Sequence, residues 1–158
     1  MAKKLVILGA GESGVGTALL AKQKGYEVFV SDGSAIKANF QKELEDNGIA
    51  FESGKHSVDQ ILNADEVMKS PGIPEKNEMV KAIRAKGIPV ISEIEFGYRY
   101  KGFSKIAAIT GSNGKSTATS LLYHICQLVN DDVAMVGNIG FSFARQIAVA
   151  PKSLYIIE

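Results

Sequence analysis

Two glycine-rich stretches constrain the fold of this chain most strongly, because each follows an apolar run and precedes a helical pattern. The first, LVILGAGESGVG, covers residues 5–16, and the second, AAITGSNGKSTATSLL, covers residues 107–122. A strand, a glycine turn and a helix in this order present backbone N–H groups to an anion at the start of the helix. The sequence therefore predicts two phosphate-binding loops in one chain of 158 residues.

Apolar runs alternate with helical patterns along the whole chain, which predicts an α/β fold. We expect a Rossmann-like parallel sheet domain with helices on both faces, followed by the first part of a P-loop-type α/β ATP-binding domain. The predicted strands are residues 3–9, 26–32, 49–53, 65–70, 88–93, 105–110, 131–137 and 153–158. The predicted helices are residues 14–24, 34–48, 76–87, 115–129 and 141–150, with a helical turn at 57–64 and a short helix followed by a connector within 93–105.

The strand pattern restarts after a connector near Gly102, which we take as a domain boundary. Residues 1–102 then form a complete first domain. Residues 103–158 contain only three predicted strands, too few for a sheet of ordinary width. We therefore interpret the second unit as the truncated opening of an ATP-binding domain.

Composition excludes several other classes of protein. Hydrophobic residues make up 46% of the chain and the net charge is +1, so neither disorder nor a basic nucleic-acid-binding surface is expected. Cys126 is the only cysteine, which rules out an internal disulfide framework. No apolar run approaches the roughly 20 residues of a membrane span. We expect a cytoplasmic protein.

The second loop, TGSNGKST, carries the residue types that bind a nucleoside triphosphate. Lys115 would reach the β- and γ-phosphates, and the Ser116 hydroxyl would ligate Mg²⁺. Glu158 ends a predicted parallel strand in the same unit, where it would help to hold that Mg²⁺. The loop is a shortened P-loop, because Ile109 stands where the full pattern has glycine. A strand-to-helix turn with an exposed lysine, and a merely exposed Glu158, remain alternatives.

The first loop, GAGESG, fits the pattern G-x-G-x-x-G, and Asp32 ends the next predicted strand. In dinucleotide-binding proteins an acid at this place bonds a ribose hydroxyl. The motif by itself indicates only a ligand with a diphosphate, which both NAD(P) and a nucleotide-sugar carry. Glu12 lies inside the turn and suits an anion only if its side chain points away. A purely structural turn remains an alternative.

Five motifs together resemble the Mur ligase family, the ATP-dependent amide ligases of bacterial peptidoglycan assembly. They are GAGESG, SPGIP (70–74), SEIEF (92–96), TGSNGKST (110–117) and GNIG (137–140). The resemblance covers the whole chain and is strongest to the D-glutamate-adding branch. It implies ATP, Mg²⁺, UDP-N-acetylmuramoyl-L-alanine and D-glutamate as ligands. It also implies a full-length monomer and no activity for this fragment alone.

The resemblance also assigns roles to individual residues, with Lys115 as the catalytic residue and Ser116 and Glu158 as the metal ligands. ATP would be bound by Gly111, Ser112, Asn113, Gly114, Lys115, Ser116 and Thr117. The UDP-sugar would be bound by Gly11, Glu12, Ser13, Gly14, Asp32, Gly33, Ser34, Gly72 and Asn138. The chain departs from the family at Gly33, where a hydroxyl or basic side chain is common.

Other functions use less of the sequence. Another Mur-type ligase is the nearest alternative. An NAD-sensing Rossmann module explains the first loop but not the second, and a generic P-loop NTPase explains the second but not the first. His56 lies in the polar stretch SGKHS and is predicted to be a solvated loop residue rather than a ligand.

Overall fold

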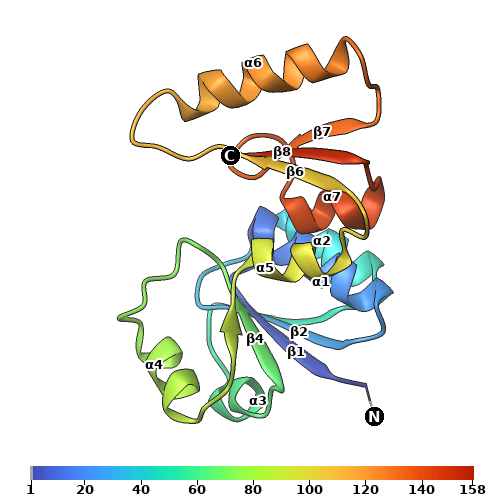
Figure 1. Ribbon diagram of the computed structural model, residues 1–158. Coiled ribbons are helices and arrows are strands. Elements are labelled where there is room, and N and C mark those ends of the chain that lie inside the picture. The colour runs from blue at the N-terminus through green and yellow to red at the C-terminus, as the bar shows by residue number, and fades with distance from the viewer. Residues whose placement is uncertain (1) are drawn as a thin grey trace.

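The computed structural model describes residues 2–158, which form two parallel sheets joined by a short connector (Figure 1). The predicted α/β class is confirmed, and every predicted strand and helix is present. Most observed elements are shorter than predicted, but α1 begins at Glu12, two residues before its predicted start. The elements are β1 (Lys4–Leu8), α1 (Glu12–Gln23), β2 (Glu27–Asp32), α2 (Ala38–Asp46), β3 (Ala50–Ser53), α3 (Val58–Leu62), β4 (Glu66–Lys69), α4 (Glu78–Ala85), β5 (Val90–Ile91), α5 (Glu93–Tyr100), β6 (Lys105–Ala108), α6 (Lys115–Gln127), β7 (Val133–Val136), α7 (Phe143–Val149) and β8 (Leu154–Ile157).

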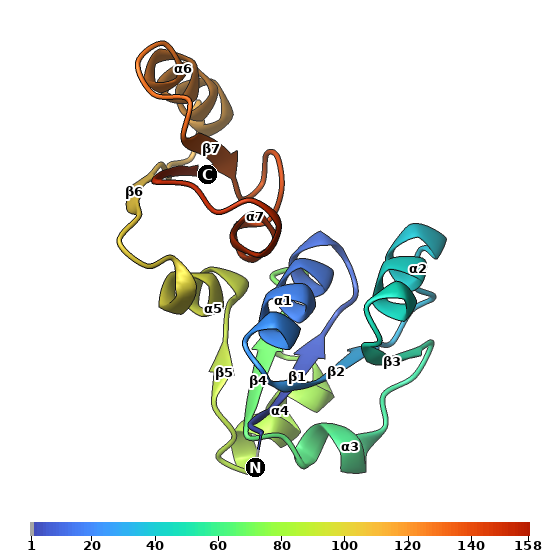
Figure 2. The same cartoon turned by 90° about the vertical axis from the view of Figure 1, so that its right-hand side faces the viewer.

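The first sheet has five parallel strands in the order β3-β2-β1-β4-β5. Its central strand β1 reads as a continuous apolar run because helices cover both of its faces. Leu5 and Ile7 pack on one side with residues of α1, whereas Val6 and Leu8 pack on the other with residues of α3 and α4. Figure 2 shows α1 and α2 on one face of the sheet, and α3 and α4 on the other.

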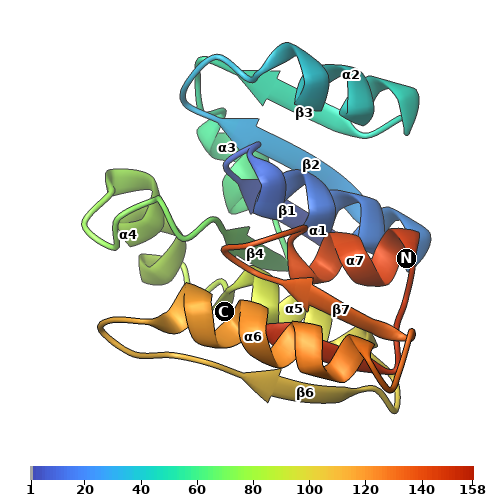
Figure 3. The same ribbon diagram turned by 90° about the horizontal axis from the view of Figure 1, so that it is seen from above.

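The second sheet has three parallel strands in the order β6-β8-β7. It lies between α6 on one face and α7 on the other (Figures 1 and 3). The carboxyl ends of both sheets, and the loops that follow their strands, face the same side of the molecule, which is the left side in Figure 1. Ligand sites in parallel sheets lie at this edge.

Helix α7 joins the two sheets, because it packs against α1 and α5 as well as against its own sheet. Two glycines make the close approach possible. A Cβ at Gly16 would lie 2.2 Å from Ser142 Oγ, and one at Gly97 would lie 2.7 Å from Phe143 Cδ1. The rings of Phe143 and Tyr155 meet edge to face at 4.9 Å, inside one hydrophobic cluster that also contains Phe96.

The connector 101–104 lies at the predicted domain boundary, near Gly102. The sheets separate there, but the apolar core continues across it through α7. A division into 1–102 and 103–158 therefore stays a prediction. None of the helices in residues 2–158 is long and apolar enough to cross a bilayer.

Candidate functional site

The first glycine loop is a tight turn between β1 and α1, and its three glycines have different surroundings. Gly9 has φ +93°, a left-handed conformation that favours glycine. A Cβ at Gly14 would lie 1.9 Å from Gly9 O, so this glycine permits close packing of strand and helix. A Cβ at Gly11 would meet nothing within 4 Å, which leaves the backbone there open to a ligand. The first turn of α1 directs unpaired N–H groups to the same place.

Asp32 links the first loop to the loop after β2. Its Oδ2 accepts a hydrogen bond from Ala10 N (2.7 Å), and its Oδ1 accepts one from Ser34 N (2.8 Å). Each carboxylate oxygen has a further lone pair, so these two bonds leave room for a ribose hydroxyl. The carboxylate thus fixes both loops at the edge of the sheet.

Most of the residues predicted to bind the UDP-sugar line three cavities at this edge of the first sheet. A cavity of about 220 Å³ is lined by Asp32, Gly33, Ser34 and Gly72, four of the residues predicted to bind the UDP-sugar. A second, of about 330 Å³, shares Asp32 and adds Gly11 and Glu12. Ser13 lines a third cavity, of about 270 Å³. Gly14 is buried and lines none of these three.

The Glu12 side chain points away from the first loop and toward α7. Its Oε1 accepts hydrogen bonds from Ser142 N (3.0 Å) and Arg145 Nε (2.7 Å). Arg145 is buried and also pairs with Glu43 on α2. The carboxylate therefore does not repel an anion from the turn but ties the first loop to the second region. Sequence reasoning missed Arg145, because its partners lie more than 100 positions away in the chain.

Glu93, the first residue of α5, is buried at the same junction. Its Oε1 accepts a hydrogen bond from Ala144 N (2.5 Å) in the first turn of α7. Burial raises the pKa of the Glu93 carboxyl to about 7, and the negative charge of Glu12 adds to this effect. Hydrogen bonds from the backbone N–H groups of Ala144 and Phe143 act in the opposite direction and lower the pKa. This side chain caps α7 and so helps to hold the two regions together.

His56 lies in a loop, as predicted, but it is less solvated than expected. The ring is half-buried and its Nδ1 lies 2.7 Å from Ser31 Oγ. It lines the same 220 Å³ cavity as Asp32 and Gly72. No local pattern predicts this contact, because His56 reaches this place only through the pairing of β3 beside β2.

The second glycine loop has the backbone of a phosphate-binding turn. Gly111 has φ +154° and Gly114, at the N-cap of α6, has φ +75°, so glycine is favoured at both. Lys115 Nζ donates a hydrogen bond to Gly111 O (2.7 Å), which folds the lysine side chain over the loop. The side chains of Ser116 and Thr117 are exposed beside it, in the first turn of α6.

Glu158 lies between the second loop and the GNIG segment. The strand that precedes it, β8, pairs with both β6 and β7, and Glu158 N donates a hydrogen bond to Val136 O (3.1 Å). The side-chain atom Glu158 Oε2 is buried and has no hydrogen-bond partner within the described chain. A buried carboxylate oxygen normally has a partner, so this one suits a cation or a ligand donor.

The side chains of Glu158 and Ser116 are of the kinds that bind Mg²⁺. Mg²⁺ is commonly held by one or two carboxylates, a hydroxyl and the phosphates of its substrate. Glu158 would supply the carboxylate, and Ser116, in the first turn of α6, would supply a hydroxyl. No group of three or more His, Cys, Asp or Glu side chains in residues 2–158 is arranged to hold a metal without such a substrate. Asn138 is exposed on the neighbouring GNIG loop.

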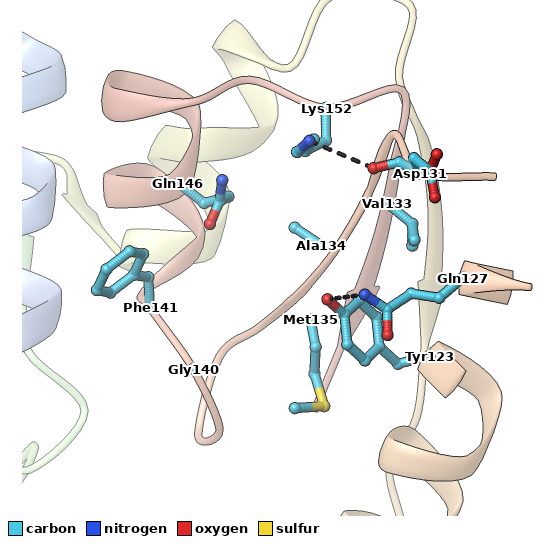
Figure 4. Close-up of a pocket in the computed structure, with 10 residues that line it drawn as sticks. All are labelled: Tyr123, Gln127, Asp131, Val133, Ala134, Met135, Gly140, Phe141, Gln146 and Lys152. Carbon is cyan, nitrogen blue, oxygen red and sulfur yellow. Dashed lines mark hydrogen bonds between the residues drawn. The ribbon is translucent and has the colours of Figure 1, made fainter. Parts of the chain in front are cut away.

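A cavity of about 690 Å³ lies apart from both glycine loops (Figure 4). It is bordered by α6, β7 and α7, and Figure 4 shows Lys152 directed toward Asp131 at its rim. None of the predicted ligand-binding residues lines it. Volume alone does not make it the functional site, since none of its lining residues belongs to either glycine loop.

Comparison with known proteins decides the family. A family model described as the N-terminal domain of MurD-like Mur ligases matches residues 3–92, more than half of the chain. The chain belongs to the Mur ligase family. This confirms the resemblance inferred from the five motifs.

Its Mur ligase relatives include proteins named UDP-N-acetylmuramoylalanine–D-glutamate ligase. The one from Cytophaga hutchinsonii is 55% identical over the whole of this chain, and the one from Bacteroides fragilis is 53% identical over 99% of it. In both cases the chain spans 35% of the relative's length.

Solved structures of Mur ligases share the fold. The UDP-N-acetylmuramate:L-alanyl-gamma-D-glutamyl-meso-diaminopimelate ligase (MPL) from Neisseria meningitides is 23% identical, with a TM-score of 0.66 over 100% of this chain and 52% of its own. The murein peptide ligase from Psychrobacter arcticus is 19% identical, with a TM-score of 0.64 over 99% of this chain and 37% of its own.

Proposed function

We propose that this chain is part of an ATP-dependent ligase that joins D-glutamate to UDP-N-acetylmuramoyl-L-alanine in cytoplasmic peptidoglycan synthesis. Residues 1–102 would form the domain that binds the uridine nucleotide. Residues 103–158 would begin the domain that binds ATP. The names of the relatives at 55% and 53% identity support this substrate pair. The net charge of +1 gives no support to a nucleic-acid partner.

The first loop would hold the UDP part of the sugar nucleotide. The open backbone at Gly11 and the start of α1 suit its diphosphate. The cavity that contains Asp32 and Gly72 suits its uridine. Asn138, on the GNIG loop beside Glu158, would contact the ligand closer to its reacting end.

The second loop would hold ATP, with the γ-phosphate directed at the alanyl carboxylate of the sugar nucleotide. Transfer of that phosphate gives an acyl phosphate and ADP. The amine of D-glutamate then attacks the acyl carbon, and phosphate leaves as the amide forms. Lys115 would exchange its bond to Gly111 O for the phosphates and stabilise their charge.

Mg²⁺ held by Ser116 and Glu158 would neutralise part of the phosphate charge when ATP is bound. The chain's own contribution is positioning, because both loops leave their sheets on the same side of the molecule (Figure 1). This shared side, with the unpartnered Glu158 Oε2 beside the second loop, carries the proposal. We expect the 158-residue chain alone to lack ligase activity.

Binding of a fluorescent ATP analogue with Mg²⁺ tests the role of the second loop. Lys115→Met should weaken binding at least tenfold, because it removes a charge-assisted contact to phosphate. Lys105→Met, on an exposed position of β6, serves as the matched control and should bind like the parent chain. Equal binding by Lys115→Met and the parent chain would contradict the assignment.

A further inference from the structure

A chain of polar side chains connects the interior of the first sheet to the predicted uridine cavity. Ser31 Oγ lies 2.7 Å from Glu52 Oε1 and 2.7 Å from His56 Nδ1. Glu52 also accepts hydrogen bonds from the backbone N–H (2.7 Å) and the hydroxyl (2.6 Å) of Ser57. Ser31 and Glu52 are buried, whereas His56 lines the cavity of about 220 Å³.

These contacts determine which atoms of Glu52, Ser31 and His56 carry a proton. Burial by itself would raise the pKa of Glu52, but the hydrogen bonds from Ser57 and Ser31 outweigh it and lower the pKa. The carboxylate is therefore ionised at neutral pH and accepts the single hydroxyl proton of Ser31. The Ser31 oxygen must then accept from His56 Nδ1–H. In the neutral imidazole, this leaves Nε2 without a proton and able to accept a hydrogen bond.

Gly33 explains why the ring can occupy this place. A Cβ at residue 33 would lie 2.9 Å from His56 Nε2, closer than ordinary contacts allow. The ring edge that carries Nε2 therefore lies where a side chain following Asp32 would begin.

We propose that His56 Nε2 accepts a hydrogen bond from the nucleoside of the bound nucleotide and so helps to select it. The donor would be an N–H of the base or a ribose hydroxyl, the two kinds of donor that a uridine nucleotide carries. Ser31 and Glu52 act as positioning residues, because they fix the tautomer of the ring. This inference rests on the proposed binding of a nucleoside diphosphate at the first loop.

Calorimetric titration of the 158-residue chain with UDP tests the inference on two matched variants. His56→Asn keeps an amide donor near Ser31 but removes the group at Nε2, and should weaken UDP binding about tenfold. His56→Gln places an amide oxygen near the Nε2 position and should stay within about threefold of the parent chain. His124→Asn, an exposed histidine on α6, is the control and should bind UDP like the parent chain.

Titrations with CDP, 2′-deoxy-UDP and 3′-deoxy-UDP identify the donor. If the base donates, the parent chain prefers UDP to CDP and His56→Asn loses this preference. If a ribose hydroxyl donates, the preference over one of the deoxy nucleotides is lost instead. Unchanged UDP affinity in a folded His56→Asn variant overturns the inference, as does a parent chain that binds all four nucleotides equally. A parent chain that does not bind UDP overturns the proposed function as well.

Discussion

The helices that follow the two glycine loops have similar lengths but very different surroundings. Helix α1 has 12 residues and buries all of those from Gly14 to Ala21. Helix α6 has 13 residues, and Thr119 is its only buried residue. The cause is visible in Figure 3, where α1 lies among other elements and α6 lies on the outer face of the second sheet.

The exposed surface of α6 includes large apolar side chains. Leu121 and Ile125 are 59% and 51% exposed, and Leu128 and Val129, just beyond the helix, are 73% and 88% exposed. The comparison shows that the second glycine turn keeps its backbone conformation although the helix that follows it is not packed on all sides. In this chain, resistance to unfolding should therefore be concentrated in the first region.

The largest difference in stability should separate two variants in which a glycine of the first loop is replaced by alanine. Gly14→Ala would press a methyl group against Gly9 O, 1.9 Å from the ideal Cβ position, so the strand and helix must separate. We expect a loss of more than about 4 kcal/mol in the free energy of unfolding, measured in urea by circular dichroism. Gly11→Ala, which meets nothing within 4 Å, should fold normally and lose affinity for the nucleotide. Equal stability of the two variants would contradict the assigned roles.

A pair of leucines tests the contrast between α1 and α6 directly. Leu20 is fully buried in α1, so Leu20→Ala should cost about 3 kcal/mol of unfolding free energy. Leu121 is 59% exposed on α6, and Leu121→Ala should cost less than about 0.5 kcal/mol. Similar losses at the two sites would show that α6 is packed as tightly as α1.

The buried carboxyl group of Glu93 should make stability depend on pH at the junction of the two regions. Its pKa is about 7 in the folded chain against an ordinary value of 4.5, so between these pH values the folded chain keeps a proton that the unfolded chain has released. Stability should then fall by about 3 kcal/mol as the pH rises from 4 to 8. Glu93→Gln should remove this contribution and be more stable than the parent chain at pH 8.

Glu95→Gln, at an exposed position of the same helix, provides the control for this pH series. It should retain the pH dependence of the parent chain. Parallel stability curves for the parent chain and Glu93→Gln between pH 4 and 8 would show that Glu93 titrates normally.

The order and class of the elements were predictable because the signals are local. β1 and β8 are continuous apolar runs, and each glycine loop stands between a strand and a helix. Gly111, Gly114 and Lys115 were placed correctly in a second loop for the same reason. The assignment of ligands to these residues stays a prediction.

Contacts between distant segments could not be predicted in the same way. Gly16 and Gly97 admit α7 by lacking a Cβ, and a missing side chain leaves no pattern in the sequence. The direction of Glu12 depends on Arg145, which is 133 positions away. The loop position of His56 was predictable, but its contact with Ser31 was not, because only the folded sheet brings β2 beside β3.

The central claim is that the first loop holds a uridine nucleotide and not a nicotinamide dinucleotide. Calorimetric titration of the chain with UDP-N-acetylmuramoyl-L-alanine, and separately with NADH, tests it most directly. We predict binding of the uridine compound and no binding of NADH. Binding of NADH alone would contradict the claim and would assign the first domain to the dinucleotide-binding class.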